Sequence, residues 1–126
     1  MTVNPTSAAA VTPLDEQAIS RLRELDPDGR LRVLERILTT YETSLLRLTG
    51  QLVQARDRGD GHAVSEIAHT LKSSSASVGA LAFARECAEV ERLLRAGAEV
   101  DLGVRCDILL AEADRALAAV RAMLRA

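Results

Sequence analysis

Hydrophobic side chains recur every three or four positions along the chain after residue 12, and no segment shows the strict alternation of a half-buried strand. This spacing places apolar side chains on one face of a helix. The pattern predicts five helices, over 14–25, 30–57, 61–78, 81–96 and 102–125. Residues 1–12 are small and polar, and we expect them to form a flexible arm before one helical domain over 13–126.

Each predicted helix carries one apolar stripe, which we expect to face a shared core. The stripe residues are, in chain order, Leu14, Ala18, Leu22 and Leu25; Leu31, Leu34, Leu38, Tyr41, Leu45, Leu48 and Leu52; Val64, Ile67, Leu71 and Val78; Phe83, Cys87, Val90 and Leu94; and Cys106, Leu110, Ala113, Leu117, Val120 and Leu124. In the third helix, Ser74 and Ser75 lie near the edges of the stripe. Their small size favours close packing, with their hydroxyls bonded back to their own helix.

Short segments with proline, glycine and aspartate separate these helices. Residues 26–29 (Asp-Pro-Asp-Gly) and 58–61 (Arg-Gly-Asp-Gly) break the first two helices, and Gly79 ends the third. Asp60 and Asp101 precede helices at positions where a carboxylate can cap them. Long helices joined by short loops predict an all-α, antiparallel up-down four-helix bundle. The short first helix is expected to cover one end.

The composition excludes several classes of function. The chain has 126 residues, a net charge of −2 with its basic residues dispersed, one Phe, one Tyr and no Trp. A basic patch or an aromatic platform for nucleic acid is therefore not expected. No apolar run is long enough to cross a bilayer, and the first residues do not resemble a signal peptide, so we expect a cytoplasmic protein. We expect a monomer, because the apolar stripes can be satisfied within one chain. Cys87 and Cys106 match no metal-binding spacing and are expected to be buried thiols.

One histidine in the third predicted helix faces away from the core. His69 points about 160° from both Ile67 and Leu71 at about 100° per residue. Lys72, three positions later, is the single lysine of a chain that otherwise uses arginine. Residues one or two helical turns from His69 are its candidate neighbours on the exposed face. They are His62, Ser65, Glu66, Lys72, Ser73 and Ala76.

This exposed face suits a phosphoryl group carried on an imidazole. A neutral histidine is an available nucleophile near neutral pH. The Lys72 ammonium can reach a phosphate oxygen, and the Ser73 hydroxyl can donate a hydrogen bond to the same group. The sequence has no glycine-rich phosphate loop and no acidic cluster for Mg²⁺. We therefore expect no cofactor or metal site, and the phosphoryl donor and its metal must come from a partner protein.

The segment around His69 resembles a known family, the histidine-containing phosphotransfer (HPt) domain of bacterial two-component phosphorelays. The family pattern is His-x-Leu-Lys-Gly, two Ser or Ala, two variable residues, a hydrophobic residue and Gly-Ala. The matching segment is His69-Thr70-Leu71-Lys72-Ser73-Ser74-Ser75-Ala76-Ser77-Val78-Gly79-Ala80. Gly59-Asp60, Ile67-Ala68 and the Glu89-x-Glu91 region also fit, and the resemblance covers about 14–125.

The resemblance implies a phosphoryl carrier and not an enzyme. His69 would be the phosphoacceptor, Lys72 would stabilise the phosphoryl group, and Gly79 would form the tight helix exit. The partners would be response-regulator receiver domains, which supply Mg²⁺ and most of the catalysis, and a sensor or hybrid histidine kinase. Ser65, Glu66, Ser73 and Ala76 are the expected partner-binding residues. The family usually has glycine where this chain has Ser73, which either narrows the approach of a receiver or adds a hydrogen bond.

Two other functions remain open at this point. A kinase dimerisation domain also presents a helical histidine, but it generally has an acidic residue and a proline where this chain has Thr70 and Ser74. A four-helix adaptor would bind a receiver or kinase without taking phosphate, and replacing His69 by Gln separates it from a carrier. We interpret His62 as a bystander, and the Arg and Glu positions of the second and fourth helices as solvated faces.

Overall fold

The computed structural model describes residues 13–126, so the flexible arm predicted for 1–12 lies outside the described residues. These residues form α2 (Glu16–Arg23), α3 (Val33–Arg58), α4 (Gly61–Ser77), α5 (Leu81–Arg95) and α6 (Leu102–Arg125). Within this part of the chain there is no strand. The five helices predicted from hydrophobic spacing are all present, with ends that differ by at most three residues.

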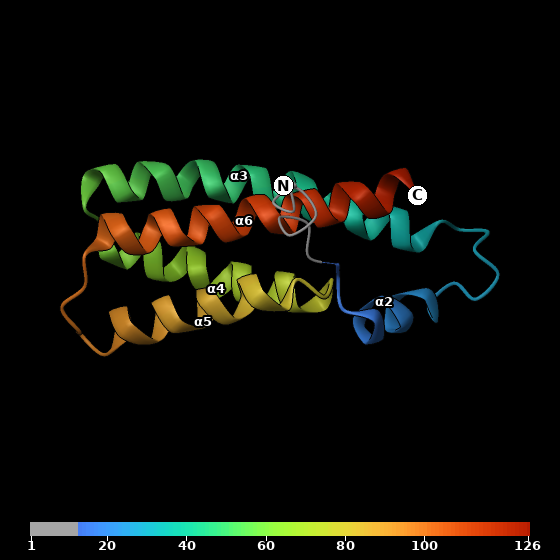
Figure 1. Cartoon of the computed structure of the whole chain (residues 1–126), viewed down its shortest axis with the longest axis horizontal. Coiled ribbons are helices and arrows are strands. Elements are labelled where there is room, and N and C mark those ends of the chain that lie inside the picture. Colours follow the sequence, from blue (N-terminus) through green and yellow to red (C-terminus); the bar gives the residue numbers. More distant parts are fainter. Residues whose placement is uncertain (1–12) are drawn as a thin grey trace, which may run out of the picture.

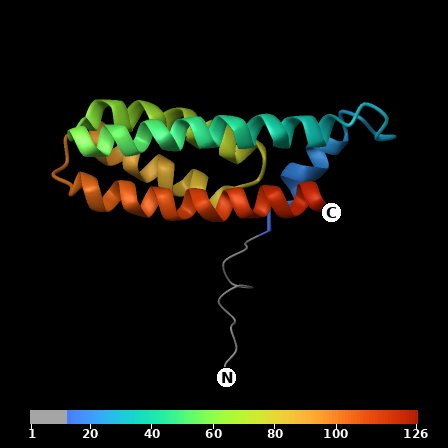
Figure 2. The same cartoon turned by 90° about the horizontal axis from the view of Figure 1, so that it is seen from above.

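The four long helices form the predicted up-down bundle. Each packs on its neighbour along the chain, and α3 also packs on α6, which closes the ring. In Figure 1, α3 and α6 make up the longer layer, and α4 and α5 make up the shorter one. The short α2 lies beyond the turn that joins α4 to α5, beside the protruding ends of α3 and α6 (Figure 2). It therefore covers one end of the shorter layer, as expected.

Aspartate side chains begin three of the helices. The carboxylates of Asp15, Asp60 and Asp101 each accept a hydrogen bond from the backbone N–H three residues later, at 3.1, 3.0 and 3.1 Å. Such a cap satisfies one of the backbone donors that the first helical turn leaves without a partner. The Asp60 cap fixes where α4 begins, and thereby the positions of all side chains along its exposed face.

The loop before α3 is longer than the sequence pattern predicts. The carboxylate of Asp26 accepts hydrogen bonds from the backbone N–H groups of Leu31 and Val33, at 3.1 and 3.2 Å. Arg32 adopts a left-handed backbone conformation with a φ of 52°. These interactions hold the segment out of the helix until Val33. The prediction that Leu25 and Leu31 are core residues is wrong, since they are 63% and 66% exposed.

The apolar stripes otherwise form the core, with one shift. The residues of α6 that are buried are Cys106, Leu109, Ala113, Ala116, Ala119 and Val120. Leu110, Leu117 and Leu124, which the predicted stripe includes, are only partly buried. A straight helix has about 3.6 residues per turn, so a stripe drawn at seven-residue spacing drifts across the buried face. Cys87 and Cys106 are buried free thiols, as predicted.

One polar contact lies inside the core. The hydroxyls of Tyr41 in α3 and Ser75 in α4 are 2.7 Å apart, and both side chains are buried. The prediction that the Ser75 hydroxyl bonds back to its own helix is therefore wrong. Its partner is the Tyr41 hydroxyl of the neighbouring helix. Ser74 does bond back, with its hydroxyl 3.3 Å from the carbonyl oxygen of Thr70. The Tyr41–Ser75 hydrogen bond joins α3 to the helix that carries His69.

None of the helices in the described residues is both long and apolar enough to span a lipid bilayer.

Candidate functional site

The exposed face of α4 presents His69 to solvent. Val64, Ile67 and Leu71 are at most 8% exposed and hold the opposite face of the helix in the core. The His69 side chain is 53% exposed. The opposite placement of the histidine and its apolar neighbours, predicted from helical spacing, is therefore confirmed.

The four residues expected to bind a partner divide into two groups. Glu66, Ser73 and Ala76 are exposed on the same face as His69. Ser65 is only 6% exposed, so its predicted place on the open surface is wrong. At about 100° of rotation per residue, Ser65 lies about 40° around the helix axis from His69, in the same direction as Lys72. This is the side on which α5 packs, and the packing covers the serine.

A carboxylate from α5 joins the two residues that the sequence singles out. Glu91 Oε2 lies 2.8 Å from His69 Nδ1, and Glu91 Oε1 lies 2.7 Å from Lys72 Nζ. Arg95, one turn further along α5, places a guanidinium nitrogen 3.0 Å from the same Oε2. The three basic side chains therefore converge on one carboxylate that is itself only 5% exposed.

These contacts keep Glu91 ionised although it is buried. The hydrogen bond from Lys72 lowers the pKa of the Glu91 carboxyl below its usual value, and the His69 hydrogen bond and the charge of Arg95 lower it further. Burial acts in the opposite direction, because desolvation disfavours the charged form. The lowering effects prevail, so the carboxylate acts only as a hydrogen-bond acceptor.

The ionised carboxylate fixes the tautomer of the histidine. Since Glu91 can only accept, His69 Nδ1 must carry the proton and donate it to Oε2. The neutral ring then has its lone pair on Nε2, on the edge of the ring away from Glu91. This arrangement leaves a nucleophilic nitrogen on an exposed side chain, with a carboxylate behind the ring that can balance a positive charge.

Glu91 is the site residue that residue-level sequence reasoning missed. The interpretation of all Arg and Glu positions on α5 as solvated is wrong for Glu91, although it holds for Glu89 and Arg92, which pair with each other in solvent. A signal for Glu91 was present in the spacing, because it lies four residues after Cys87 and next to Val90 on the buried stripe. A carboxylate at such a position needs a partner from a neighbouring helix.

Gly79 forms the tight exit expected after α4. Its φ is +85°, and a Cβ at this position would lie 2.7 Å from the backbone nitrogen of Asp15. That nitrogen donates a hydrogen bond to the carbonyl oxygen of Gly79 at 2.9 Å. The start of α2 therefore packs directly on the end of α4, and a side chain at Gly79 would separate them.

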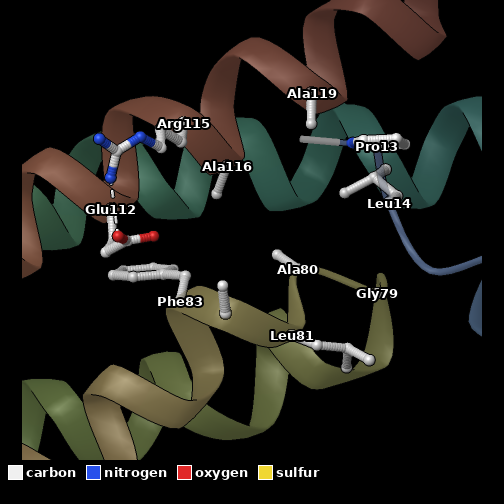
Figure 3. A pocket seen from close by; sticks show the side chains of 11 residues that line it. Pro13, Leu14, Gly79, Ala80, Leu81, Phe83, Glu112, Arg115, Ala116 and Ala119 are labelled. Carbon is white, nitrogen blue, oxygen red and sulfur yellow. Dashed lines mark hydrogen bonds and ion pairs between the residues drawn. The ribbon is translucent and has the colours of Figure 1, made fainter. Parts of the chain in front are cut away.

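The hollow nearest this exit is too small to be a substrate pocket. Figure 3 shows it between the start of α5, α6 and the segment around Pro13. Its volume is about 30 Å³. It is lined by Phe83, Ala116, Ala119 and eight other residues, and His69 is not one of them. A volume of this size holds only one or two water molecules. The exposed histidine therefore lies on an open surface, which suits a macromolecular partner.

Comparison with known proteins identifies the family. The model of the Hpt domain family matches residues 36–124, which is most of the chain, so the protein belongs to the Hpt family. The crystal structure of histidine-containing phosphotransfer protein B (HptB) from Pseudomonas aeruginosa PAO1 is similar, with 28% sequence identity and a TM-score of 0.72. The match covers 89% of this chain and 90% of that chain. No curated protein matches. The fold and the family together support a role in histidine phosphotransfer.

Proposed function

We propose that this protein carries a phosphoryl group on Nε2 of His69 within a two-component phosphorelay. The group comes from the phosphorylated aspartate of a receiver domain, or from a hybrid kinase, and passes to the aspartate of another receiver. The observation that carries this proposal is the hydrogen bond between His69 Nδ1 and Glu91, because it leaves the lone pair on Nε2 of an exposed side chain.

The transfer needs no proton to leave the protein. The Nε2 lone pair attacks the phosphorus, a nitrogen–phosphorus bond forms, and the bond from phosphorus to the aspartyl oxygen breaks. The aspartate departs as a carboxylate, and the Nδ1 proton stays between the ring and Glu91. The ring thereby gains positive charge, which the Glu91 carboxylate stabilises at 2.8 Å. The reverse steps deliver the group to the next receiver.

Lys72 has a second partner available once the group arrives. In the described structure its ammonium is 2.7 Å from Glu91, and its side chain is 37% exposed. A phosphoryl group adds about two negative charges near neutral pH. The flexible lysine stem allows the ammonium to turn toward these oxygens, where it acts as a point charge. Lys72 therefore stabilises the phosphorylated form.

The receiver docks around His69 and supplies the metal. Glu66, Ser73 and Ala76 surround the histidine with short or exposed side chains. Such a surface leaves room for a receiver to bring its aspartate and Mg²⁺ to the ring. The contact is small, because the partner must leave after transfer, and interfaces of this kind lie at the low end of the size range.

Transfer from a phosphorylated receiver tests this proposal. Wild-type protein and His69→Gln are incubated with receivers from a broad panel that carry labelled phosphate. The expected result is acid-labile, alkali-stable label on the wild type and none on His69→Gln. Binding of a receiver that is equal in both proteins, without any label, would instead support the adaptor function.

A further inference from the structure

The Ser and Thr hydroxyls along α4 differ in whether they already form a hydrogen bond. The hydroxyls of Thr70, Ser74 and Ser77 bond to backbone carbonyl oxygens of their own helix, at 3.1 to 3.4 Å. The hydroxyl of Ser75 bonds to Tyr41. Ser73 is exposed, and its hydroxyl has no hydrogen-bond partner among the residues that the structure describes. It is the member of this run that is free to bind an incoming group.

Ser73 also lies on the side of the helix toward which the reactive nitrogen points. Around the axis of α4, at about 100° per residue, Lys72 lies about 60° from His69 on the side that faces α5. Ser73 lies about 40° from His69 on the side that faces away from α5. The Nδ1 edge of the ring faces α5, because it is bonded to Glu91. The Nε2 edge therefore faces away from α5, toward Ser73.

The spacing along the helix places the two residues next to each other. Residues four positions apart are neighbours on a helix surface, with about 5–6 Å between their Cβ atoms. The Ser73 hydroxyl is therefore close enough to reach a group carried on the His69 ring. Glu66 lies on the same side, but its carboxylate cannot donate to a phosphate oxygen. Thr70 lies further around the helix, and its hydroxyl is already bonded.

We propose that the Ser73 hydroxyl donates a hydrogen bond to the phosphoryl group on His69 Nε2 and thereby prolongs the lifetime of the phosphohistidine. This inference rests on the proposed function, and it resolves which of two effects serine has where the family usually carries glycine. Ser73 and Lys72 then hold the phosphoryl oxygens from opposite sides of the ring.

The expected effect on lifetime follows from the way the nitrogen–phosphorus bond breaks. In a loose transition state, electron density moves from the phosphoryl oxygens toward phosphorus as the leaving nitrogen departs. A donor that holds density on those oxygens stabilises the bound group more than the transition state. Hydrolysis is therefore slower with the hydroxyl in place. Because the hydrogen bond to the charged oxygens is only partly lost in the transition state, we expect the rate to change by about two- to tenfold.

Hydrolysis of the phosphorylated protein in the absence of any partner tests this inference. The full chain is phosphorylated with phosphoramidate, freed of the reagent, and followed by the decay of its phosphohistidine ³¹P signal. Ser73→Ala and Ser73→Gly are expected to shorten the lifetime, and Ser73→Thr, which keeps a hydroxyl, is expected to preserve most of it. Ser77→Ala is the matched control, because Ser77 is an exposed serine of the same helix two turns from His69.

The outcomes separate this inference from the proposed function. Phosphate on His69 with equal lifetimes in Ser73→Ala, Ser77→Ala and the wild type would overturn the role of Ser73 and leave the carrier function intact. A lifetime longer in Ser73→Ala than in the wild type would also overturn it. No phosphate on His69 from either phosphoramidate or a receiver would overturn the proposed function, and this inference with it.

Discussion

The proton position on the His69 ring depends on a residue from another helix. Glu91 is held ionised by Lys72, His69 and Arg95, and it fixes the proton on Nδ1, so Nε2 on the far edge of the ring keeps its lone pair. His69 and Lys72 were predictable from the sequence, because both lie on the same face of one helix. Glu91 contacts them only after α5 packs against α4, and sequence spacing does not specify which side chains meet across two helices.

Replacing the carboxylate by an amide tests its role in transfer. Glu91→Gln keeps the size of the side chain and an oxygen acceptor for Nδ1, but removes the negative charge. An ionised acceptor makes a hydrogen bond about twice as strong as a neutral one, so we expect transfer to His69 to slow roughly tenfold. Rapid-quench kinetics with a phosphorylated receiver measure the rate. Glu89→Gln, which changes a solvated carboxylate on the same helix, should transfer at the wild-type rate.

The Glu91 carboxylate also makes the stability of the fold depend on pH in the acid range. Its pKa is lowered in the folded state relative to its ordinary value of 4.5, so the unfolded chain binds its proton first as pH falls. The stability that Glu91 contributes is therefore fully present above pH 4.5 and is lost as pH falls through the lowered value. Urea unfolding of wild type and Glu91→Gln from neutral to acid pH should show a difference in free energy that shrinks in acid. A difference that is constant with pH would contradict this role.

At the scale of elements, local sequence signals predicted most of the structure. The helices followed from apolar spacing and the aspartate caps, because both act within a few residues. The start of α3 did not follow, since Asp26 bonds to backbone groups five and seven residues later and holds the loop open. The burial of Ser65 and the Tyr41–Ser75 contact likewise depend on neighbouring helices.

The junction of α2 with α4 depends on the absence of a side chain at Gly79. In Gly79→Ala the new Cβ would lie 2.7 Å from Asp15 N and 3.2 Å from the Cβ of Ala18, and the φ of +85° disfavours any side chain. Backbone strain alone costs about 1–2 kcal/mol, and the collision adds to it.

We expect Gly79→Ala to unfold at lower urea concentration and its α2 amides to exchange faster with solvent. Gly97→Ala is the matched control, because Gly97 also has a positive φ, of 72°, but no atom within 4 Å of a new Cβ. The free energy of unfolding of Gly97→Ala should fall only by the amount that backbone strain costs. Equal losses in the two variants would show that the contact with α2 contributes nothing to stability.

The whole molecule presents His69, the proposed phosphoacceptor, on an open helical surface. The bundle follows the fold of the Hpt family. The two longest helices, α3 and α6, extend past the shorter pair, and α2 fills the space beyond it (Figure 1). The bundle therefore supports the cluster formed by His69, Lys72, Glu91 and Arg95, which lies where α4 contacts α5.

In the proposed function a receiver docks on the surface around His69, so a large side chain placed there should weaken receiver binding. Ala76 is exposed two turns from His69, and Ala76→Arg places a long charged side chain in the path of the partner. We expect its KM for a phosphorylated receiver to rise roughly tenfold, equivalent to about 1.4 kcal/mol, while phosphorylation by phosphoramidate is unchanged. Ala111→Arg, an exposed change on α6, which packs chiefly on α3 and α5, should leave both reactions unaltered.

The position of phosphorus on the imidazole tests the central claim most directly. The protein, with ¹⁵N-labelled histidine, is phosphorylated by a receiver and its ring nitrogens are examined by NMR for coupling to ³¹P. We predict coupling at Nε2 of His69, a proton retained on Nδ1 of the same ring, and no coupling at His62. Phosphorus on Nδ1 of His69, on His62, or on neither histidine would contradict the account.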